Sequence, residues 1–301
     1  MAGRVALAPG NTMARFSPSD AALEGFRLTR EHPGVVLAWS AVYFGGILLI
    51  GLTMMATLGP QFIALARKGQ LNTDPEATAA LLTQSWPAFL LVLLMTAVLM
   101  SIIAAGVMRL VLRPAEPGFA HLRVGRDELR LAAANLICIL IYVISAVVGV
   151  IGARGAAQSG TVGVVVAGAA TLIFAIWIGV RLSLLLPTVF VTGKISLGLA
   201  WRKTEGHFWR LFGMIMMAVI FYVIVYILFS IISVVVVELS GGQAAIQDIA
   251  RLTPLTAITV LITLVLQLLL QVLQIVMIYA PFAVAYRDLA LVTDEIAVAG
   301  T

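Results

Sequence analysis

The feature that most constrains this chain is a series of six apolar runs, none of which contains Asp, Glu, Lys, Arg or His. The runs cover residues 35–58, 87–108, 131–152, 162–180, 211–237 and 254–285. About 20 such residues in a helix cross the hydrocarbon core of a bilayer, and an isolated strand cannot satisfy its backbone groups in lipid. The sequence therefore predicts an all-α, polytopic transmembrane bundle of six spans, paired as three hairpins.

The composition excludes several other classes of protein. Of the 301 residues, 61% are hydrophobic and 11% are charged, against roughly 25% charged residues in an average soluble protein. A soluble fold of this size cannot bury so much apolar surface and cover it with so little charge. A soluble enzyme, a disordered protein and a nucleic-acid binder are therefore not expected. The single cysteine, Cys138, excludes a disulfide framework within the chain.

The basic residues predict the orientation of the chain in the membrane. Of the 19 Lys and Arg residues, 15 fall on the side that carries both termini and 4 fall on the other. By the positive-inside rule both termini are cytoplasmic. We expect an N-terminal tail with an amphipathic helix over residues 1–34, a membrane domain over 35–285 and a C-terminal tail over 286–301. No apolar signal-peptide core precedes the first span, and translation is expected to start at Met1 or Met13.

Two segments on the predicted cytoplasmic side have the pattern of interfacial amphipathic helices. In residues 197–211, apolar positions recur every three or four residues, with basic side chains on the other side. The N-terminal segment starts with Ser17 as a helix cap and Pro18 as the first helical residue, and its expected apolar face is Ala22, Leu23 and Phe26. These helices either pack as caps on the bundle or contact anionic headgroups. The candidate interface residues are Arg27, Arg30, Trp201, Arg202, Lys203, Trp209 and Arg210. On the opposite side, residues 74–82 and 243–252 are expected to form short helical caps.

Rows of small residues mark the third and fourth runs. In the fourth run small residues recur every four positions, at Gly163, Ala167, Thr171, Ala175 and Gly179. Ser145 and Gly149 form a shorter row with the same spacing in the third run. Small residues at this spacing let two helix backbones approach closely in lipid. We interpret the rows as a helix-packing surface, with the lining of a pore as the alternative.

The sixth run contains a polar stripe. Its members are Gln267, Gln271, Gln274 and Thr263, and Thr256 and Thr259 extend it. A glutamine that faces lipid is costly, so we expect the stripe to face the interior of the bundle. Three interpretations remain open: hydrogen bonds between helices, a contact between copies of the chain, and the lining of a path for a polar solute. Candidate hydrogen-bond partners are Asn135, Tyr142, Tyr222 and Tyr226.

The spans lack the residues on which intramembrane chemistry usually depends. No run contains a carboxylate, a histidine or a basic residue, and the sequence has no His-Glu-x-x-His, Gly-x-Ser-x-Gly or Walker lysine motif. We therefore expect no enzymatic activity, no catalytic residue and no cofactor. A metal site shared by His32, His121 and His207 is conceivable because all three lie on one side of the membrane, but it is not expected.

Several stretches resemble a known group of proteins. A helix that ends at a proline, within residues 181–187, precedes a Trp-x-x-Thr-x-Gly-x-x-Trp stretch made of Trp201, Thr204, Gly206 and Trp209. Together with residues 114–119 and 125–129, these features resemble a family of poorly characterised bacterial six-span inner-membrane proteins, which is similar to the membrane domain of some glycerophosphodiester phosphodiesterases. The resemblance implies fold, location and a lipid or envelope context. It carries over no catalytic residue, because no soluble stretch here is long enough for the phosphodiesterase domain.

Two functions fit these features. The first is a non-enzymatic envelope accessory or scaffold protein that contacts anionic headgroups of membrane lipids, a protein partner or a second copy of itself through the cytoplasmic interface residues. The second is a facilitative transporter or channel for a small polar solute, which would use the glutamine stripe. The sequence does not decide between them.

Overall fold

The computed structural model describes residues 17–67, 83–115, 118–242 and 253–299. Within these ranges the chain forms helices and no strand, and six helices are long and apolar enough to cross a membrane. They are α2 (Pro33–Arg67), α4 (Trp86–Leu112), α5 (Arg126–Ala156), α6 (Gly160–Leu182), α9 (Phe208–Leu239) and α11 (Pro254–Ala299). The predicted all-α polytopic fold is thereby confirmed. The expected caps over 74–82 and 243–252 lie outside the described residues.

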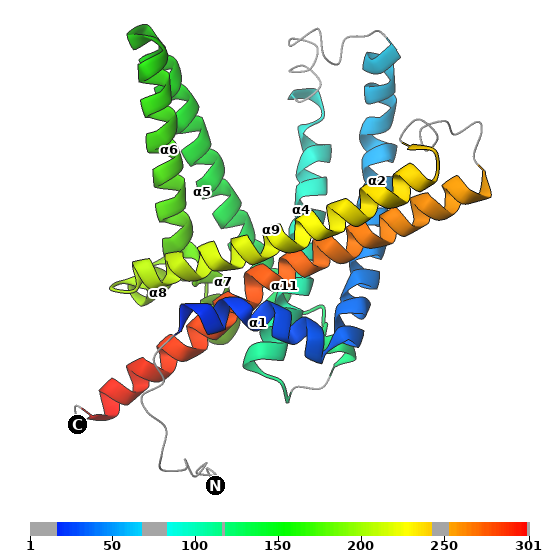
Figure 1. Cartoon of the computed structure of the whole chain (residues 1–301). Coiled ribbons are helices and arrows are strands. Elements are labelled where there is room, and N and C mark those ends of the chain that lie inside the picture. The colour runs from blue at the N-terminus through cyan, green and yellow to red at the C-terminus, as the bar shows by residue number, and fades with distance from the viewer. Residues whose placement is uncertain (1–16, 68–82, 116–117, 243–252, 300–301) are drawn as a thin grey trace.

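The six long helices form three hairpins, α2–α4, α5–α6 and α9–α11, which meet at one end and diverge towards the other (Figure 1). The end where they meet, which we call the base, also holds four short elements: α1 (Pro18–Glu31), η1 (Phe119–His121), α7 (Leu185–Thr192) and α8 (Leu197–Thr204). The short turn η2 (Ala157–Ser159) joins α5 to α6 at the far end. Because α4 contacts α2, α5 and α11, it links the three hairpins at the base.

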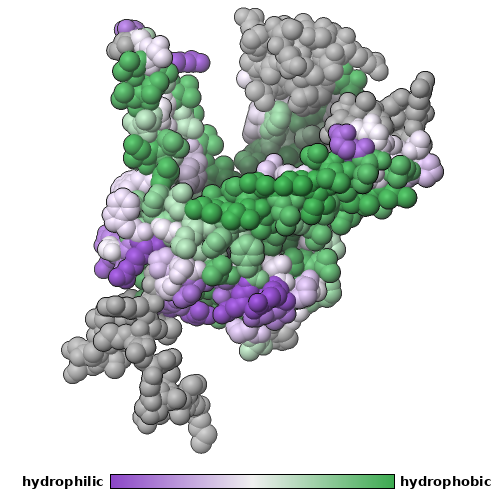
Figure 2. Space-filling model, in the orientation of Figure 1, coloured by the Kyte–Doolittle hydropathy of each residue, from purple (hydrophilic) through white to green (hydrophobic). Residues whose placement is uncertain are grey.

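The buried core lies at the base rather than along the full length of the hairpins. Each hairpin contributes a fully buried side chain there, as shown by Trp39, Met108, Leu131 and Val276. The far halves instead expose apolar side chains, since Ile151 is 64% exposed and Val162 is 75% exposed. So extensive an apolar surface suits lipid tails rather than water. Figure 2 shows this surface in green, above a base where hydrophilic side chains gather.

The hairpins do not run parallel to one another. Helix α9 has 32 residues, so it is about 48 Å long at 1.5 Å per residue, against a hydrocarbon thickness of about 30 Å. A helix of this length tilts or projects beyond the bilayer, and Figure 1 shows α9 and α11 oblique to α5 and α6. Helix α11 is longer still and includes Pro281 within it. It continues as helix beyond residue 285, where the sixth apolar run ends, as far as Ala299.

Helix α1 packs on the base as a cap. The Ser17 side chain accepts a hydrogen bond from the backbone N–H of Asp20 (3.5 Å), and Pro18 is the first helical residue, as predicted. A methyl group on Gly25 would lie 2.9 Å from Cα of Met277, so α1 approaches α11 closely. The buried face includes Ala21, Ala22, Gly25 and Leu28. The expected face was wrong at Leu23, which is 45% exposed, because the contact with α11 is centred on the glycine.

The second amphipathic segment is broken into two helices. Helix α8 begins after Ser196, whose side chain accepts from the N–H of Leu199 (3.2 Å), and it ends at Thr204. Gly206 has a φ of +76°, in the left-handed region that favours glycine, and α9 starts two residues later at Phe208. The expected single interfacial helix over 197–211 was therefore wrong, because the chain turns at this glycine.

Candidate functional site at the base of the hairpins

A buried ion pair lies where the hairpins meet. Arg109 near the end of α4 forms a salt bridge with Glu128 in the first turn of α5, and both side chains are 3% exposed. Nη1 of Arg109 also donates to the backbone carbonyl of His121 in η1 at 2.6 Å. Removal of one partner of such a pair leaves an uncompensated buried charge. The pair therefore fixes the end of α4 against the start of α5.

The carbonyl groups held by this junction belong to a strained turn. Ala120 and His121 have φ angles of 49° and 57°, in a region that residues other than glycine rarely adopt. Nε1 of Trp39 donates to the Ala120 carbonyl at 2.8 Å, while Arg109 holds the next carbonyl. Since these donors come from α2 and α4, the first hairpin stabilises the strained turn that leads into α5.

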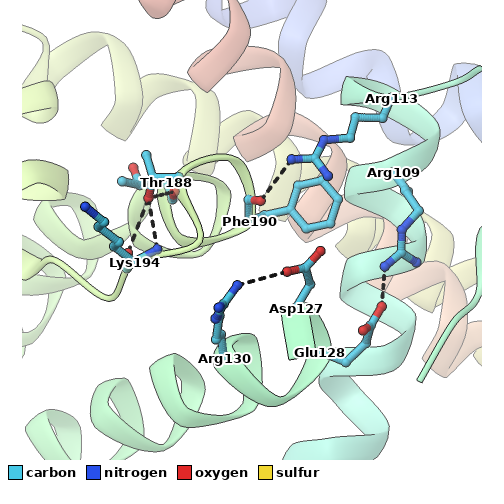
Figure 3. A network of polar contacts seen from close by, with 9 residues as sticks. Arg109, Arg113, Asp127, Glu128, Arg130, Thr188, Phe190 and Lys194 are labelled. Atoms are coloured by element: carbon cyan, nitrogen blue, oxygen red, sulfur yellow. Dashed lines mark hydrogen bonds and ion pairs between the residues drawn. The ribbon is translucent and has the colours of Figure 1, made fainter. Parts of the chain in front are cut away.

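Phe190 attaches α7 to the same junction. The guanidinium carbon of Arg113 lies 4.8 Å from the centroid of the Phe190 ring, and that of Arg109 lies 5.7 Å from it. Arg113 also donates to the Phe190 carbonyl at 3.4 Å. Figure 3 shows these groups beside a more exposed ion pair between Asp127 and Arg130 (3.3 Å). The junction thus anchors α2, α4, α5 and α7 to one another.

A second cationic group lies between α6 and α8. The guanidinium carbon of Arg181 is 6.0 Å from the Trp177 ring and 5.2 Å from the Trp201 ring. The two indoles meet edge to face, with centroids 5.1 Å apart. Nη1 of Arg181 donates to the hydroxyl of Thr204 at 3.4 Å. Its Nε is buried and has no hydrogen-bond partner in the described part of the chain. We call these four residues the Arg181 cluster.

The predicted interface residues of α8 and α9 divide into packed and exposed groups. Trp201 belongs to the Arg181 cluster, and Nζ of Lys203 lies 4.1 Å from the centroid of the Tyr286 ring in α11. Arg202 and Arg210 are exposed, and Trp209 is 78% exposed. The packed members attach α8 to α6 and α11, while the exposed ones face away from the protein.

On α1 the two predicted interface residues are both exposed. Arg27 pairs with Glu24 at 2.8 Å, and its side chain is 55% exposed. Arg30 lies one turn further along the helix. The buried face of α1 packs against α11 and α9, so the cations project from the outer side of this cap.

The glutamine stripe lies against α9. The hydroxyl of Tyr222 donates to Oε1 of Gln274 at 3.3 Å, and Nε2 of Gln271 donates to the same oxygen at 3.1 Å. Gln267 is exposed. The buried hydroxyl of Thr263 has no hydrogen-bond partner within the described ranges. Of the suggested partners, Tyr222 meets the stripe, whereas Asn135 donates to the Ser101 hydroxyl at 2.9 Å and so joins α5 to α4.

Two cavities follow the stripe between α9 and α11. One, of 260 Å³, is lined by polar side chains of both helices, including Tyr226, Ser230, Ser233 and Gln267. The other, of 150 Å³, includes Tyr222 and Gln274 in a mainly apolar lining. The glutamines therefore combine hydrogen bonding between helices with the lining of small cavities.

The rows of small residues lie along the contact between α5 and α6. Every predicted member in α6, from Gly163 to Gly179, is half-buried, and Ser145 is buried. A side chain at Gly149 would overlap that of Thr171, and a methyl group on Gly179 would lie 2.6 Å from the Tyr142 hydroxyl. Beside this contact runs an open apolar groove of 720 Å³, lined from Gly152 and Ala167 at one end to Ile178 at the other.

Two of the three histidines lie within electrostatic reach of each other: burial first, and then the charge of His32, lower the pKa of His121. His207 contacts the Glu205 carbonyl through Nδ1 (2.9 Å), whereas His121 belongs to the strained turn. Across the described residues, no group of three or more His, Cys, Asp or Glu side chains is placed to hold a metal ion.

Sequence reasoning missed the roles of Arg109, Glu128 and Arg181. It placed both arginines just outside the spans, although apolar residues follow each of them without a break: Leu110, Val111 and Leu112 after one, and Leu182 after the other. A cation enclosed by apolar neighbours on both sides was the available signal that the helix continues past it. Nothing in the sequence identified Glu128 as the partner of Arg109.

Comparison with known proteins leaves these sites to be interpreted from the structure alone. No protein-family model matches the chain, and neither curated proteins nor solved structures gave a significant match.

Proposed function

We propose that this protein is a non-enzymatic integral membrane protein of the bacterial inner membrane, where it acts as an envelope accessory or scaffold protein in contact with anionic lipid headgroups. The excess of basic residues on one side supports a cytoplasmic location for both termini. We also propose that the chain is related to bacterial six-span inner-membrane proteins and to the membrane domains of glycerophosphodiester phosphodiesterases, which its sequence resembles.

One observation carries this proposal: the base exposes an aromatic side chain among cations. Trp209 is 78% exposed, and Arg210 beside it and Arg202 on α8 are exposed as well. Such an indole is poorly accommodated by water but well accommodated in the headgroup layer of a bilayer. Exposed cations at the same level attract anionic headgroups. We infer that this surface lies on the lipid headgroups.

The test is the lipid preference of the reconstituted protein. We expect the double variant Arg202→Glu/Arg210→Glu to lose preference for phosphatidylglycerol over phosphatidylcholine in the surrounding lipid, because two exposed attractive charges become repulsive. Each charge near an anionic surface contributes about 1 kcal/mol. Quenching of tryptophan fluorescence by brominated forms of the two lipids measures this preference directly.

The matched control is Arg154→Glu, which reverses an exposed charge near the end of α5, far from the base. In the same quenching measurement, we expect this variant to keep the wild-type preference for phosphatidylglycerol over phosphatidylcholine. If the Arg202→Glu/Arg210→Glu variant and the wild type show equal quenching by brominated phosphatidylglycerol, headgroup contact at the base is rejected.

A second function, a facilitative transporter or channel for a small polar solute, is favoured by one observation. The 260 Å³ cavity between α9 and α11 gathers the polar side chains of Tyr226, Ser230, Ser233 and Gln267, beside four apolar lining residues, within two otherwise apolar helices. Gln274 lines the next cavity towards the base, so polar groups follow one line through this hairpin.

Replacement of Gln267, Gln271 and Gln274 by Leu separates the two functions. Under the scaffold proposal, proteoliposomes with the wild-type protein take up labelled glycerol or urea no faster than protein-free vesicles. The triple variant then behaves in the same way, because the glutamines serve packing. If the wild type takes up the solute and the triple variant does not, the scaffold proposal is rejected in favour of the transporter.

A further inference from the structure

Among the residues that the structure describes, Arg181 has no anionic partner. Its polar contact in the described structure is one long hydrogen bond to the Thr204 hydroxyl, and its Nε is buried without a partner. A guanidinium has five N–H donors in a fixed fork that fits a phosphate or a carboxylate. The two indoles stabilise its charge through their faces, but they leave most of these donors unused. The contrast is Arg109, which has a carboxylate and a carbonyl.

The apolar groove of the α5–α6 hairpin leads to this cation. Its lining in α6 includes Ala170, Phe174 and Ile178, which share a helix face with Arg181 because they are spaced by three or four residues. The contact is also direct, since the Phe174 ring stacks on the Trp177 ring with centroids 6.0 Å apart. Arg181 therefore lies about one helical turn beyond the end of the groove.

The dimensions match one leaflet of a bilayer. The groove extends along α6 from Ala167 to Ile178, which is about 16 Å at 1.5 Å per residue, or roughly half of a 30 Å hydrocarbon core. Arg181 is separated from the far end of α6 at Gly160 by about 31 Å on the same scale. This places the guanidinium one hydrocarbon thickness from the opposite interface, at the level of lipid phosphates.

We propose that the Arg181 cluster and the α5–α6 groove form a binding site for one anionic phospholipid. The phosphodiester of the headgroup accepts hydrogen bonds from Arg181, and one acyl chain lies in the groove. Charge complementarity selects this occupant, because an apolar helix of a partner would leave the guanidinium unpaired. The inference deepens the proposed function and rests on it in one respect, that the base lies at the bilayer surface.

The test is native mass spectrometry of the full-length protein in detergent, titrated with dioleoyl phosphatidylglycerol or dioleoyl phosphatidylethanolamine. We expect the wild type to retain one phosphatidylglycerol and to bind phosphatidylethanolamine more weakly, because its ammonium group offsets the phosphate charge. Arg181→Gln should raise the dissociation constant for phosphatidylglycerol about tenfold, as expected for the loss of one charge-assisted phosphate contact. Arg202→Gln, which removes an exposed cation of α8, should change it less than about twofold.

A second pair of variants tests the groove without touching the cation. A methyl group at Gly152 would meet no atom within 4 Å, and this residue lines the groove, so the leucine side chain of Gly152→Leu should occupy it. We expect this variant to weaken phosphatidylglycerol binding while it remains folded. Gly168→Leu also enters open space but is not part of the groove lining, and it should bind as the wild type does. Gly152→Leu carries the test even if Arg181→Gln fails to fold.

Three outcomes would overturn the site. If a folded Arg181→Gln protein binds phosphatidylglycerol with wild-type affinity, Arg181 does not contact the headgroup. If Gly152→Leu binds phosphatidylglycerol with wild-type affinity, the acyl chain does not lie in the groove. Displacement of the lipid by inorganic phosphate at matched concentration shows an anion site without a lipid. If Arg202→Glu/Arg210→Glu loses the preference for phosphatidylglycerol in the surrounding lipid but still binds one phosphatidylglycerol tightly, this site is independent of the general lipid contact of the base.

Discussion

Two arginines at equivalent places in the sequence have different environments in the structure. Arg109 and Arg181 are each the first cation after an apolar run. Arg109 is enclosed with Glu128 and both are 3% exposed, whereas Arg181 lies against two indoles and a hydroxyl. The neighbouring element causes the difference, because the first turn of α5 supplies a carboxylate and α8 supplies none. Arg109 is thereby fixed within the protein, and Arg181 is the residue for which we propose a ligand.

Glu128→Gln tests the structural role at this scale. We expect it to reduce the free energy of unfolding by roughly 3 kcal/mol, because Arg109 would remain buried without a counter-charge. The measurement is unfolding of the purified protein by SDS in mixed micelles, followed by circular dichroism.

The adjacent residue provides the control. Asp127 pairs with Arg130 on the surface, where the two side chains are 38% and 43% exposed, so Asp127→Asn should cost less than about 1 kcal/mol. Equal stability of Glu128→Gln and Asp127→Asn would show that the buried pair does not hold α4 to α5.

At the scale of elements, two of the three hairpins are held together by different kinds of contact. Helices α5 and α6 meet through small residues, with Gly149 opposite Thr171. Helices α9 and α11 share the hydrogen bond between Tyr222 and Gln274. Because lipid tails are as apolar as the helices, close packing and polar contacts replace the hydrophobic effect between spans.

Gly149→Leu tests the packing of α5 on α6. The new side chain would collide with Thr171, and overpacking of this kind typically costs about 1–3 kcal/mol. The free energy of unfolding in SDS should fall by this amount, whereas Gly168→Leu on the open side of α6 should leave it unchanged. A Gly149→Leu protein as stable as Gly168→Leu would mean that the two helices do not need their close approach.

Element boundaries show where sequence periodicity is sufficient and where it is not. The cap of α1 at Ser17 and Pro18 followed from local chemistry and was confirmed. The buried face of the same helix was wrong at Leu23 because the approach of Gly25 to Met277 involves a residue far along the chain. The break between α8 and α9 at Gly206 was also missed, because the amphipathic pattern continues across it.

At the scale of the whole molecule, the protein is three hairpins joined at a polar base. The core and the polar junction lie at the base, while the far halves expose apolar side chains (Figures 1 and 2). Contacts at the base involve α4 with α2, α5 and α11, and α1 with α9 and α11. The base is therefore the part that fixes the relative positions of the hairpins.

The sequence by itself determined the fold class, because hydropathy is a local property and an uncharged run of 20 residues has few options in a cell. It likewise placed the cations outside the apolar runs, and the small residues and glutamines on their helices. Only the tertiary structure paired Arg109 with Glu128, 19 residues away, or brought Trp39 to a carbonyl 81 residues away. Such contacts depend on how the hairpins pack at the base. The same packing placed Arg181 at the end of an apolar groove, with no anionic partner among the described residues.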